Sequence, residues 1–225
     1  MADTVFEIVS VYEFVQKLCI DFSSNEEAEF SIETSKDDIE FENNGDGFSS
    51  DYLETLAIYR KLCDKLIEKN VLLFHASAVS VDGFAYMFLA KSGVGKSTHT
   101  LLYKKAFKDR AIMINDDKPL VKIEEGTIVV YGSAWNGKHN RGNNVSFPLK
   151  AVCFLERGKD NEIEEISFKD SFGRLIEHSY SQNDEAFLRK KLLLLDKMKN
   201  IRFYSLKCNM NDDAALVSFE KMKGD

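Results

Sequence analysis

The sequence is poor in proline, with only 2 in 225 residues, and it contains 4 cysteines and 1 tryptophan. So little proline, together with 30% charged and 44% hydrophobic residues, argues against long disordered stretches and allows a substantial core. The cysteines, at positions 19, 63, 153 and 208, are far apart and each lies among apolar residues. This pattern excludes a zinc site or a disulfide framework and is typical of reduced core cysteines in a cytoplasmic protein.

Two further absences narrow the class of protein. No apolar run approaches the length needed to span a membrane, and charged residues interrupt the first twenty positions, unlike a signal peptide. There is also no excess of positive charge, because the formal net charge is -7. An acidic chain repels polyanions, so we expect neither nucleic acid nor an anionic membrane surface as a general partner.

The first seventy residues differ from the rest and suggest a small α+β region at 1–70, either separate from or continuous with the remainder at 71–225. Residues 5–15 are strand-like, and 28–32 and 38–41 alternate apolar with polar residues across a polar turn. This predicts an antiparallel meander with one wet face. Ser50 or Asp51 is expected to cap the following helix, whose apolar residues recur at helical spacing from Leu53 to Ile67.

The rest of the chain predicts an α/β fold with a mixed sheet. Apolar runs at 71–80 and 84–90 flank Asp82-Gly83, a strong hairpin signal. A helix follows, with Thr98, Leu101, Leu102 and Ala106 expected on its buried face, and then a buried strand at 111–114. Later strands are predicted at 120–123, 128–131, 151–155 and 202–206, and helices at 170–178, 184–198 and 212–221. In the helix at 184–198 we expect one charged edge, at 189–191, and a buried face formed by the leucines at 192–195.

Between the second run and this helix lies a phosphate-binding motif. Its residues are Ser92, Gly93, Val94, Gly95, Lys96, Ser97 and Thr98. Glycines at 93 and 95 let the backbone point its N–H groups inward, Lys96 would contact the β- and γ-phosphates, and Ser97 would offer a hydroxyl to Mg²⁺. The usual pattern begins with glycine, whereas this sequence has Ala90, which fits if φ stays negative there. The motif predicts binding of a nucleoside triphosphate with Mg²⁺.

An acidic pair ends the strand after the motif's helix. Asp116 and Asp117 follow the buried run at 111–114, and parallel strands in such a unit end at the same edge as the phosphate loop. One carboxylate there would hold the metal ion, and the other would act as a base toward an attacking hydroxyl. The alternative is a polar turn that only closes the strand.

Taken together, the run 74–79, the hairpin, the loop 92–97 and Asn115-Asp116-Asp117 resemble HPr kinase/phosphorylase. They also resemble the nucleotide core of ATP-dependent phosphoenolpyruvate carboxykinase, which shares that P-loop fold. The resemblance is strongest over 71–117 and implies an HPr kinase-like nucleotide-binding domain at 71–225. The family's glutamate-containing signature would fall near 131–135, where this sequence has no glutamate.

The resemblance also implies roles for individual residues. It places Lys96 and Ser97 on phosphate and magnesium, His75 near the transferred phosphate, Asp116 as the general base or metal ligand, and Asp117 beside it. Independently of the family, the polar segment 135–144 would form either a mobile loop or an ordinary surface loop. A mobile loop would close on the phosphates or on the acceptor, with Lys138, His139 and Arg141 as its candidate contacts. Because HPr kinase is a hexamer, the resemblance further implies a homo-oligomer.

Three functions remain open at this point. The first is an ATP- and Mg²⁺-dependent kinase that transfers the γ-phosphoryl group to a hydroxyl, a serine of a protein or peptide, with Asp116, His75 and Lys96 as catalytic residues and with Ser97, Asp116 and Asp117 as metal ligands. The second is an ATP-binding sensor or scaffold, favoured by Ala90 and the missing glutamate. The third is carboxykinase-like decarboxylation, which needs more arginines and metal ligands than this chain offers.

Overall fold

The computed structural model describes residues 1–137 and 140–224. Two strands lie in the N-terminal segment, β1 (Phe6–Val9) and β2 (Phe30–Glu33). The large sheet contains β3 (Val71–Leu73), β4 (Ala76–Val81), β5 (Phe84–Leu89), β6 (Ala111–Asn115), β7 (Leu120–Glu124), β8 (Thr127–Tyr131), β9 (Ser146–Arg157), β10 (Glu162–Ile166) and β11 (Arg202–Cys208). The helices are α1 (Phe14–Leu18), α2 (Lys36–Phe41), α3 (Ser50–Leu66), α4 (Lys96–Phe107), α5 (Phe168–His178), α6 (Glu185–Asp196) and α7 (Asp213–Met222).

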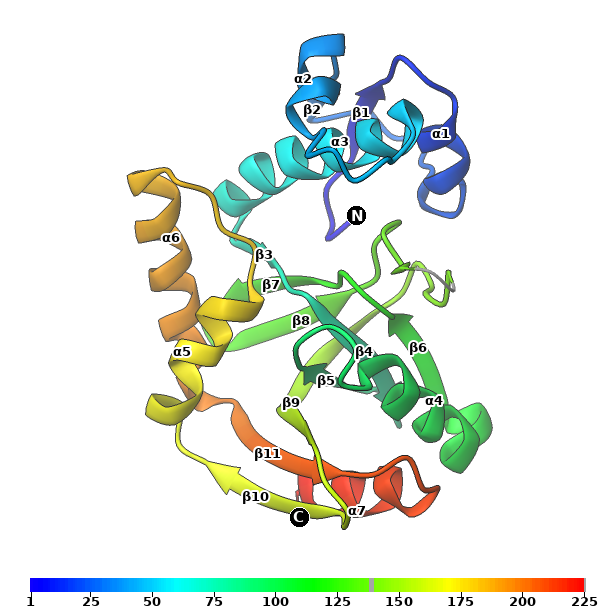
Figure 1. Cartoon of the computed structure of the whole chain (residues 1–225). Coiled ribbons are helices and arrows are strands. Elements are labelled where there is room, and N and C mark those ends of the chain that lie inside the picture. Colours follow the sequence, from blue (N-terminus) through cyan, green and yellow to red (C-terminus); the bar gives the residue numbers. More distant parts are fainter. Residues whose placement is uncertain (138–139, 225) are drawn as a thin grey trace.

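The large sheet is mixed and curled, and the long strand β9 joins its two parts (Figure 1). The amino end of β9 pairs antiparallel with β8, while the rest of β9 pairs in parallel with β5 on one side and β11 on the other. Strand β4 is antiparallel to both β5 and β6. Strands β5, β6, β9 and β11 therefore run in the same direction, and their carboxyl ends meet at one edge of the sheet. This edge is where open α/β sheets bind ligands.

The turn between β4 and β5 confirms the hairpin predicted from Asp82-Gly83. Asp82 and Gly83 have φ values of 52° and 83°, the left-handed conformations that a type I′ turn requires at both central positions. The turn fixes the register from Ala76 opposite Leu89 to Val81 opposite Phe84. It thereby sets where β5 ends and the phosphate motif begins.

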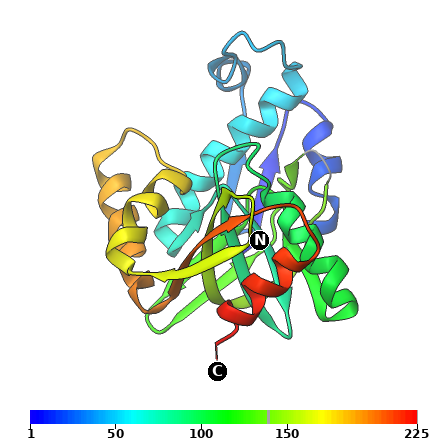
Figure 2. The same ribbon diagram turned by 60° about the horizontal axis from the view of Figure 1, so that its bottom comes forward.

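Helices cover both faces of the sheet. α5 and α6, yellow and orange, lie on one side, and α4 and α7, green and red, on the other (Figure 2). The first interface buries Leu175, Phe187 and Leu194 against the sheet, and the second buries Tyr103 and Phe219. The chain therefore has the α/β character that its sequence predicts.

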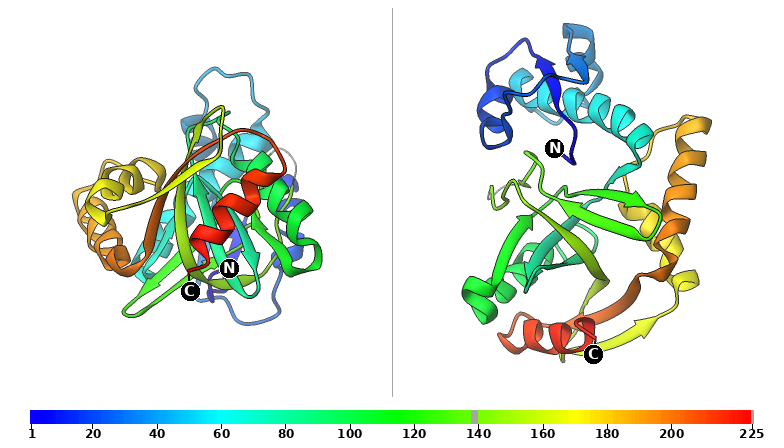
Figure 3. Two further views of the ribbon diagram at one scale, coloured as in Figure 1. Left: turned by 90° about the horizontal axis from the view of Figure 1, so that it is seen from below. Right: turned by 180° about the vertical axis from the view of Figure 1, so that it is seen from behind.

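A third apolar cluster joins the N-terminal segment to the sheet. It contains Ile58 and Leu62 from α3 together with Leu73, Leu120 and Trp135. From behind, the N-terminal elements lie beyond the β7–β8 end of the sheet, next to the loop that follows β8 (Figure 3).

The predicted antiparallel meander in this segment is wrong. β1 and β2 pair in parallel, Phe6 opposite Phe30, because α1 provides a long enough crossover between them. Residues 38–41 belong to helix α2, since Ser35 and Asp38 form a capping box that starts a helix. The expected cap of α3 is also displaced, from Ser50 or Asp51 to Ser49.

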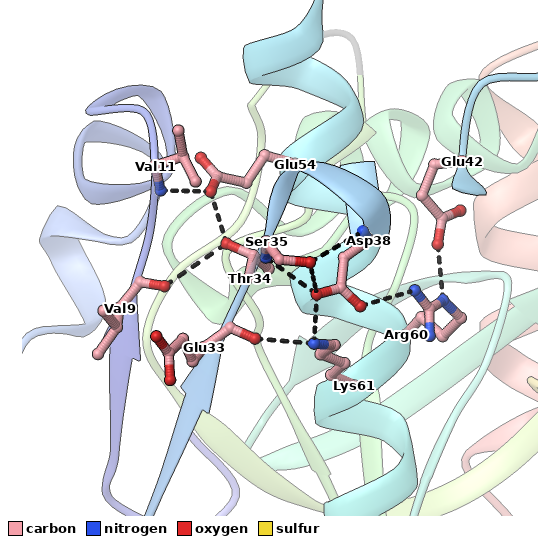
Figure 4. A network of polar contacts seen from close by, with 10 residues as sticks. All are labelled: Val9, Val11, Glu33, Thr34, Ser35, Asp38, Glu42, Glu54, Arg60 and Lys61. Atoms are coloured by element: carbon pink, nitrogen blue, oxygen red, sulfur yellow. Dashed lines mark hydrogen bonds and ion pairs between the residues drawn. The ribbon is translucent and has the colours of Figure 1, made fainter. Parts of the chain in front are cut away.

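A buried glutamate holds the turn before α1 against α3 (Figure 4). The Glu54 side chain is fully buried, and its carboxylate accepts hydrogen bonds from the backbone N–H groups of Val11 and Tyr12, at 2.5 and 2.9 Å, and from the Thr34 hydroxyl, at 2.6 Å. Three donors satisfy a charge that would otherwise be costly to bury. This contact sets the position of α1 relative to the sheet.

Other sequence predictions need smaller corrections. The buried face of α4 carries His99, Thr100, Tyr103 and Phe107, whereas Leu101 and Ala106, which were predicted there, are exposed, because aromatic residues pack toward α7. Strand β10 was not predicted, since its alternating glutamates lack a buried face. In α6 Lys191 is buried and donates to the carbonyls of Ile176 and Ser179, while Leu192 and Leu193 are exposed.

The cysteines are all free thiols, as predicted, and Cys63 and Cys153 are buried. Across residues 1–137 and 140–224, no helix combines the length and apolar character required to cross a membrane.

Candidate functional site

The loop between β5 and α4 has the backbone conformation that its sequence predicts. Gly93 and Gly95 have φ values of 78° and 131°, and a side chain at either position would find open space. Glycine is therefore needed there for its conformational freedom and not for lack of room. Ala90 is not among the described residues with a positive φ, so alanine is tolerated where the usual motif has glycine.

Three side chains meet beside this loop. The Lys96 ammonium donates to the Ala90 carbonyl at 2.8 Å and lies 3.2 Å from Nε2 of His75. The same Nε2 lies 3.4 Å from the Asp117 carboxylate. One imidazole nitrogen carries either a lone pair or a proton, so it accepts from Lys96 or donates to Asp117, but not both at once. A ligand that draws Lys96 away would free His75 to pair with Asp117.

The pKa values of this group reflect burial and charge. Burial lowers the pKa of Lys96, although Asp117 and Asp116 oppose the shift. Burial by itself would raise the pKa of Asp117, but the hydrogen bond with His75 and the charges of Lys118, His75 and Lys96 outweigh it, so the pKa lies below its usual value. Asp117 is thus a carboxylate at neutral pH, able to accept a hydrogen bond or a proton.

Asp116 lies in a different environment from its neighbour. Its side chain is almost fully buried, and Oδ1 accepts a hydrogen bond from the Ser77 hydroxyl at 2.6 Å. The Ser77 hydroxyl lies 3.4 Å from that of Thr100, on the first turns of α4. These contacts fix Asp116 between β4 and the helix that follows the loop. Asp116 and Ser97 both line the cavity described below.

Asn115 shapes the turn that presents the two aspartates. Its carbonyl oxygen Oδ1 accepts from the backbone N–H groups of Asp117 and Lys118, at 2.8 and 2.6 Å. Its amide donates to Ser133 and, at 2.8 Å, to Oδ1 of Asn136. Asn115 is fully buried, so this network is shielded from water. Asn115 was not predicted as a site residue, although asparagine, whose side chain accepts from backbone N–H groups two residues on, is a known turn signal.

A cavity of about 710 Å³ is lined by the loop together with His75, Asp116 and Asp117. The sheet edge and α4 form one wall, with His75, Lys96, Ser97, Asp116 and Asp117. The opposite wall is largely apolar and comes from α1, α3 and the loop after β8, with Phe14, Leu18, Tyr52, Leu56 and Trp135. This wall was not predicted from the sequence, because no local pattern shows that residues so far apart in the chain will face the phosphate loop.

The segment after β8 is anchored at both ends. Asn136 is buried against Asn115, and a side chain at Gly142 would collide with the Asn136 amide. Asn143 donates from its amide to the Met113 carbonyl at 2.7 Å. The described part of this segment is therefore attached to β6. Of the residues proposed there as phosphate ligands, Lys138 and His139 lie outside the described residues, and Arg141 is half-buried but not among the described residues lining the cavity.

Metal binding at this site would depend on oxygen ligands. Among the described residues, no three His, Cys, Asp or Glu side chains gather closely enough to hold a metal ion. Ser97, which carries a hydroxyl, and Asp116 and Asp117, which carry carboxylates, line the same cavity. This set fits Mg²⁺, which takes one or two carboxylates and completes its ligands with phosphate and water.

Comparison with known proteins gives little. No protein-family model matches the chain, and no curated protein matches it. Among solved structures, the HPr(Ser) kinase/phosphatase from Coxiella burnetii is similar at 9% sequence identity and a TM-score of 0.39, over 68% of this chain and 99% of that one. The likeness is a distant one of fold.

Proposed function

We propose that this chain binds ATP with Mg²⁺ and transfers the γ-phosphoryl group to a hydroxyl, as the resemblance to HPr kinase implies. The observation that carries the proposal is the contact chain from Lys96 through His75 to Asp117, in the same cavity as the glycine-containing loop. A cation, a titratable ring and a carboxylate are thereby held where a loop and a helix N-terminus favour phosphate.

In the proposed binding mode, the backbone of residues 92–97 surrounds the phosphates. Lys96 leaves the Ala90 carbonyl and His75 to contact the β- and γ-phosphates. Ser97 and Asp116 would hold Mg²⁺, which neutralises phosphate charge when bound. The buried surroundings of Lys96 strengthen its attraction for phosphate compared with the same contact in water.

We assign the role of general base to Asp117. The sequence had instead predicted Asp116 for this role. Asp117 pairs with His75 and its side chain is 29% exposed, whereas Asp116 is largely buried and its Oδ1 accepts a hydrogen bond from Ser77. The acceptor oxygen would attack the γ-phosphorus while its proton passes to the Asp117 carboxylate. The bond from the γ-phosphorus to the bridging oxygen breaks, and ADP leaves with that electron pair.

Residues 1–70 would act together with 71–225 on the acceptor, since α1 and α3 contribute the apolar wall of the shared cavity. The acceptor, a protein or peptide hydroxyl, would pack its apolar neighbours against Phe14, Tyr52 and Trp135. An ordered apolar wall positions an acceptor without contributing charge.

Radiolabel transfer from ATP into a peptide pool tests the assignment. Asp117→Asn should lower transfer about 10²- to 10⁴-fold while ATP binding stays within a fewfold. Asp116→Asn should instead raise the Mg²⁺ concentration needed for half-maximal ATP binding. Transfer by Asp117→Asn at the wild-type rate would disprove the assigned base.

A second candidate is an ATP-binding sensor or scaffold without phosphotransfer. It is favoured by the small number of metal ligands among the described residues and by the prior engagement of Asp116 with Ser77. Under this reading ATP would bind and change partner affinity, yet no label would reach any acceptor. Label transfer that depends on Asp117 would eliminate it.

A further inference from the structure

A second pocket lies on the other side of the phosphate loop. It measures about 510 Å³ and shares Gly93, Gly95 and Thr98 with the cavity described above. The loop thus separates two hollows that meet along its backbone. Asp116 and Asp117 lie on one side, after β6, while the second pocket lies beside the ends of β9 and β11.

The second pocket is lined mainly by apolar side chains. Val94, Leu102 and Leu155 form its inner surface, and Met210 lies at its rim, 72% exposed. Such a surface suits a flat ring with little charge and does not suit phosphate. Met210 is a flexible side chain that adapts to the face of a ring.

Two polar groups distinguish this pocket from an ordinary apolar hollow. The exposed Arg157 guanidinium donates to the Gly93 carbonyl at 2.5 Å, so a planar cation is held between the loop and the pocket. His99 lines the pocket, is 2% exposed, and has no hydrogen-bond partner for Nδ1 among the described residues. An arginine plane stacks well on an aromatic ring, and an unsatisfied buried nitrogen favours a ligand or water nearby.

We propose that this pocket holds the nucleobase of the triphosphate, with the base against Leu102 and Leu155 and with the Arg157 guanidinium stacked on its face. The inference rests on the proposed function, because it requires that the loop bind a nucleotide's phosphates. The ribose then crosses the loop at Gly93, where the absence of a side chain leaves open space. Apolar contact and stacking recognise any base, so the pocket distinguishes nucleotides from inorganic polyphosphate more than one base from another.

Calorimetric titration with two Mg²⁺-loaded probes, ATP and inorganic tripolyphosphate, tests the inference. Leu102→Trp would fill the pocket, so ATP affinity should fall about tenfold, the magnitude of one lost stacking contact, while tripolyphosphate affinity is unchanged. Leu101→Trp is the matched control, because Leu101 is the adjacent, exposed residue of α4 and is not among the described residues lining the pocket. The control should leave both affinities unchanged.

The outcomes separate the two proposals. If Leu102→Trp binds ATP as tightly as the wild type does, or loses both probes equally, the base does not use this pocket. If the wild-type chain binds neither probe, the proposed function itself fails.

Photo-crosslinking gives a readout that does not depend on a substitution. 8-Azido-ATP should label peptides containing 155–158 or 208–210. Labelling of Phe14 or Tyr52 would place the base in the other cavity and overturn the inference.

Discussion

The two sides of the phosphate loop are held in place in different ways. On one side, Asn115, Asp116 and Asp117 are fixed by directed hydrogen bonds to Ser133, Ser77 and His75. On the other side, Leu102, Leu155 and Met210 offer apolar area. Polar networks keep atoms at definite positions, whereas apolar contact is graded by area and tolerates displacement. One side is therefore suited to chemistry and the other to affinity.

Within the phosphate loop itself, the largest effect is expected at its lysine. Lys96→Met removes the cation that would face the β- and γ-phosphates, so phosphotransfer should fall about 10²- to 10³-fold. Rates of label transfer from ATP measure the loss. The control is Lys91→Met, because the Lys91 side chain is in the same loop but 81% exposed. Equal losses for the two variants would show that general positive charge, and not the position of Lys96, matters.

On the apolar side of the loop, the free energy of unfolding should depend on pH through His99. Burial lowers the pKa of His99 from 6.5 to about 4, so His99 binds its proton at a lower pH in the folded protein than in the unfolded chain. Stability from neutral His99 is complete above pH 6.5 and is lost as pH falls toward 4, by about 3 kcal/mol in the free energy of unfolding.

Urea unfolding between these pH values measures that loss. His99→Phe keeps the aromatic contacts with Phe88 and Tyr103 and removes the titrating group, so its unfolding free energy should vary less with pH. An unchanged pH dependence in the variant would assign the acid sensitivity to other groups.

Removing a network residue on the polar side should cost less. Asn115→Ala leaves the N–H groups of Asp117 and Lys118 without their acceptor, so we expect a loss of about 1–3 kcal/mol in the free energy of unfolding. Phosphotransfer should also decrease because the aspartates shift. Asn144→Ala, at an exposed asparagine, should change stability by less than about 0.5 kcal/mol. Similar losses of unfolding free energy for both variants would mean that the buried hydrogen bonds of Asn115 stabilise the fold no more than an exposed asparagine does.

The smallest effect is expected at the rim of the apolar pocket. Met210→Ala removes a side chain that is 72% exposed, so the free energy of unfolding should change by less than about 0.5 kcal/mol. Thermal unfolding without nucleotide measures it. A loss of several kcal/mol would show that Met210 belongs to the core. The apolar side of the loop would then be as firmly fixed as the hydrogen-bonded side.

Local signals allowed much of the fold to be predicted. Asp82-Gly83 identified the hairpin, and the glycines at 93 and 95 identified the loop, since each depends on backbone conformations that few residues adopt. The pairing of the N-terminal strands was not predictable, because the alternation of apolar and polar residues does not show which strand pairs with which. One expected strand is a helix, which begins at the capping box of Ser35.

The candidate site was only partly predictable for a similar reason. Its chemical groups lie in short motifs, and His75, Lys96 and Asp117 indeed come together. Which aspartate faces His75, however, depends on the turn set by Asn115 and on Ser77 from another strand. The wall formed by Phe14 and Tyr52 depends on the buried Glu54 that positions α1. Such long-range contacts leave no periodic trace in the sequence.

The long strand β9 has a consequence for how the chain folds. β5, which carries the phosphate loop, has β4 on one side and β9 on the other, and β9 ends at Arg157. During synthesis the hairpin of β4 and β5 can form early, but the loop's strand stays unpaired along one edge until β9 emerges. Pairings between such distant segments slow folding. The proposed ability to bind phosphate should therefore appear late, after the sheet has closed around β5.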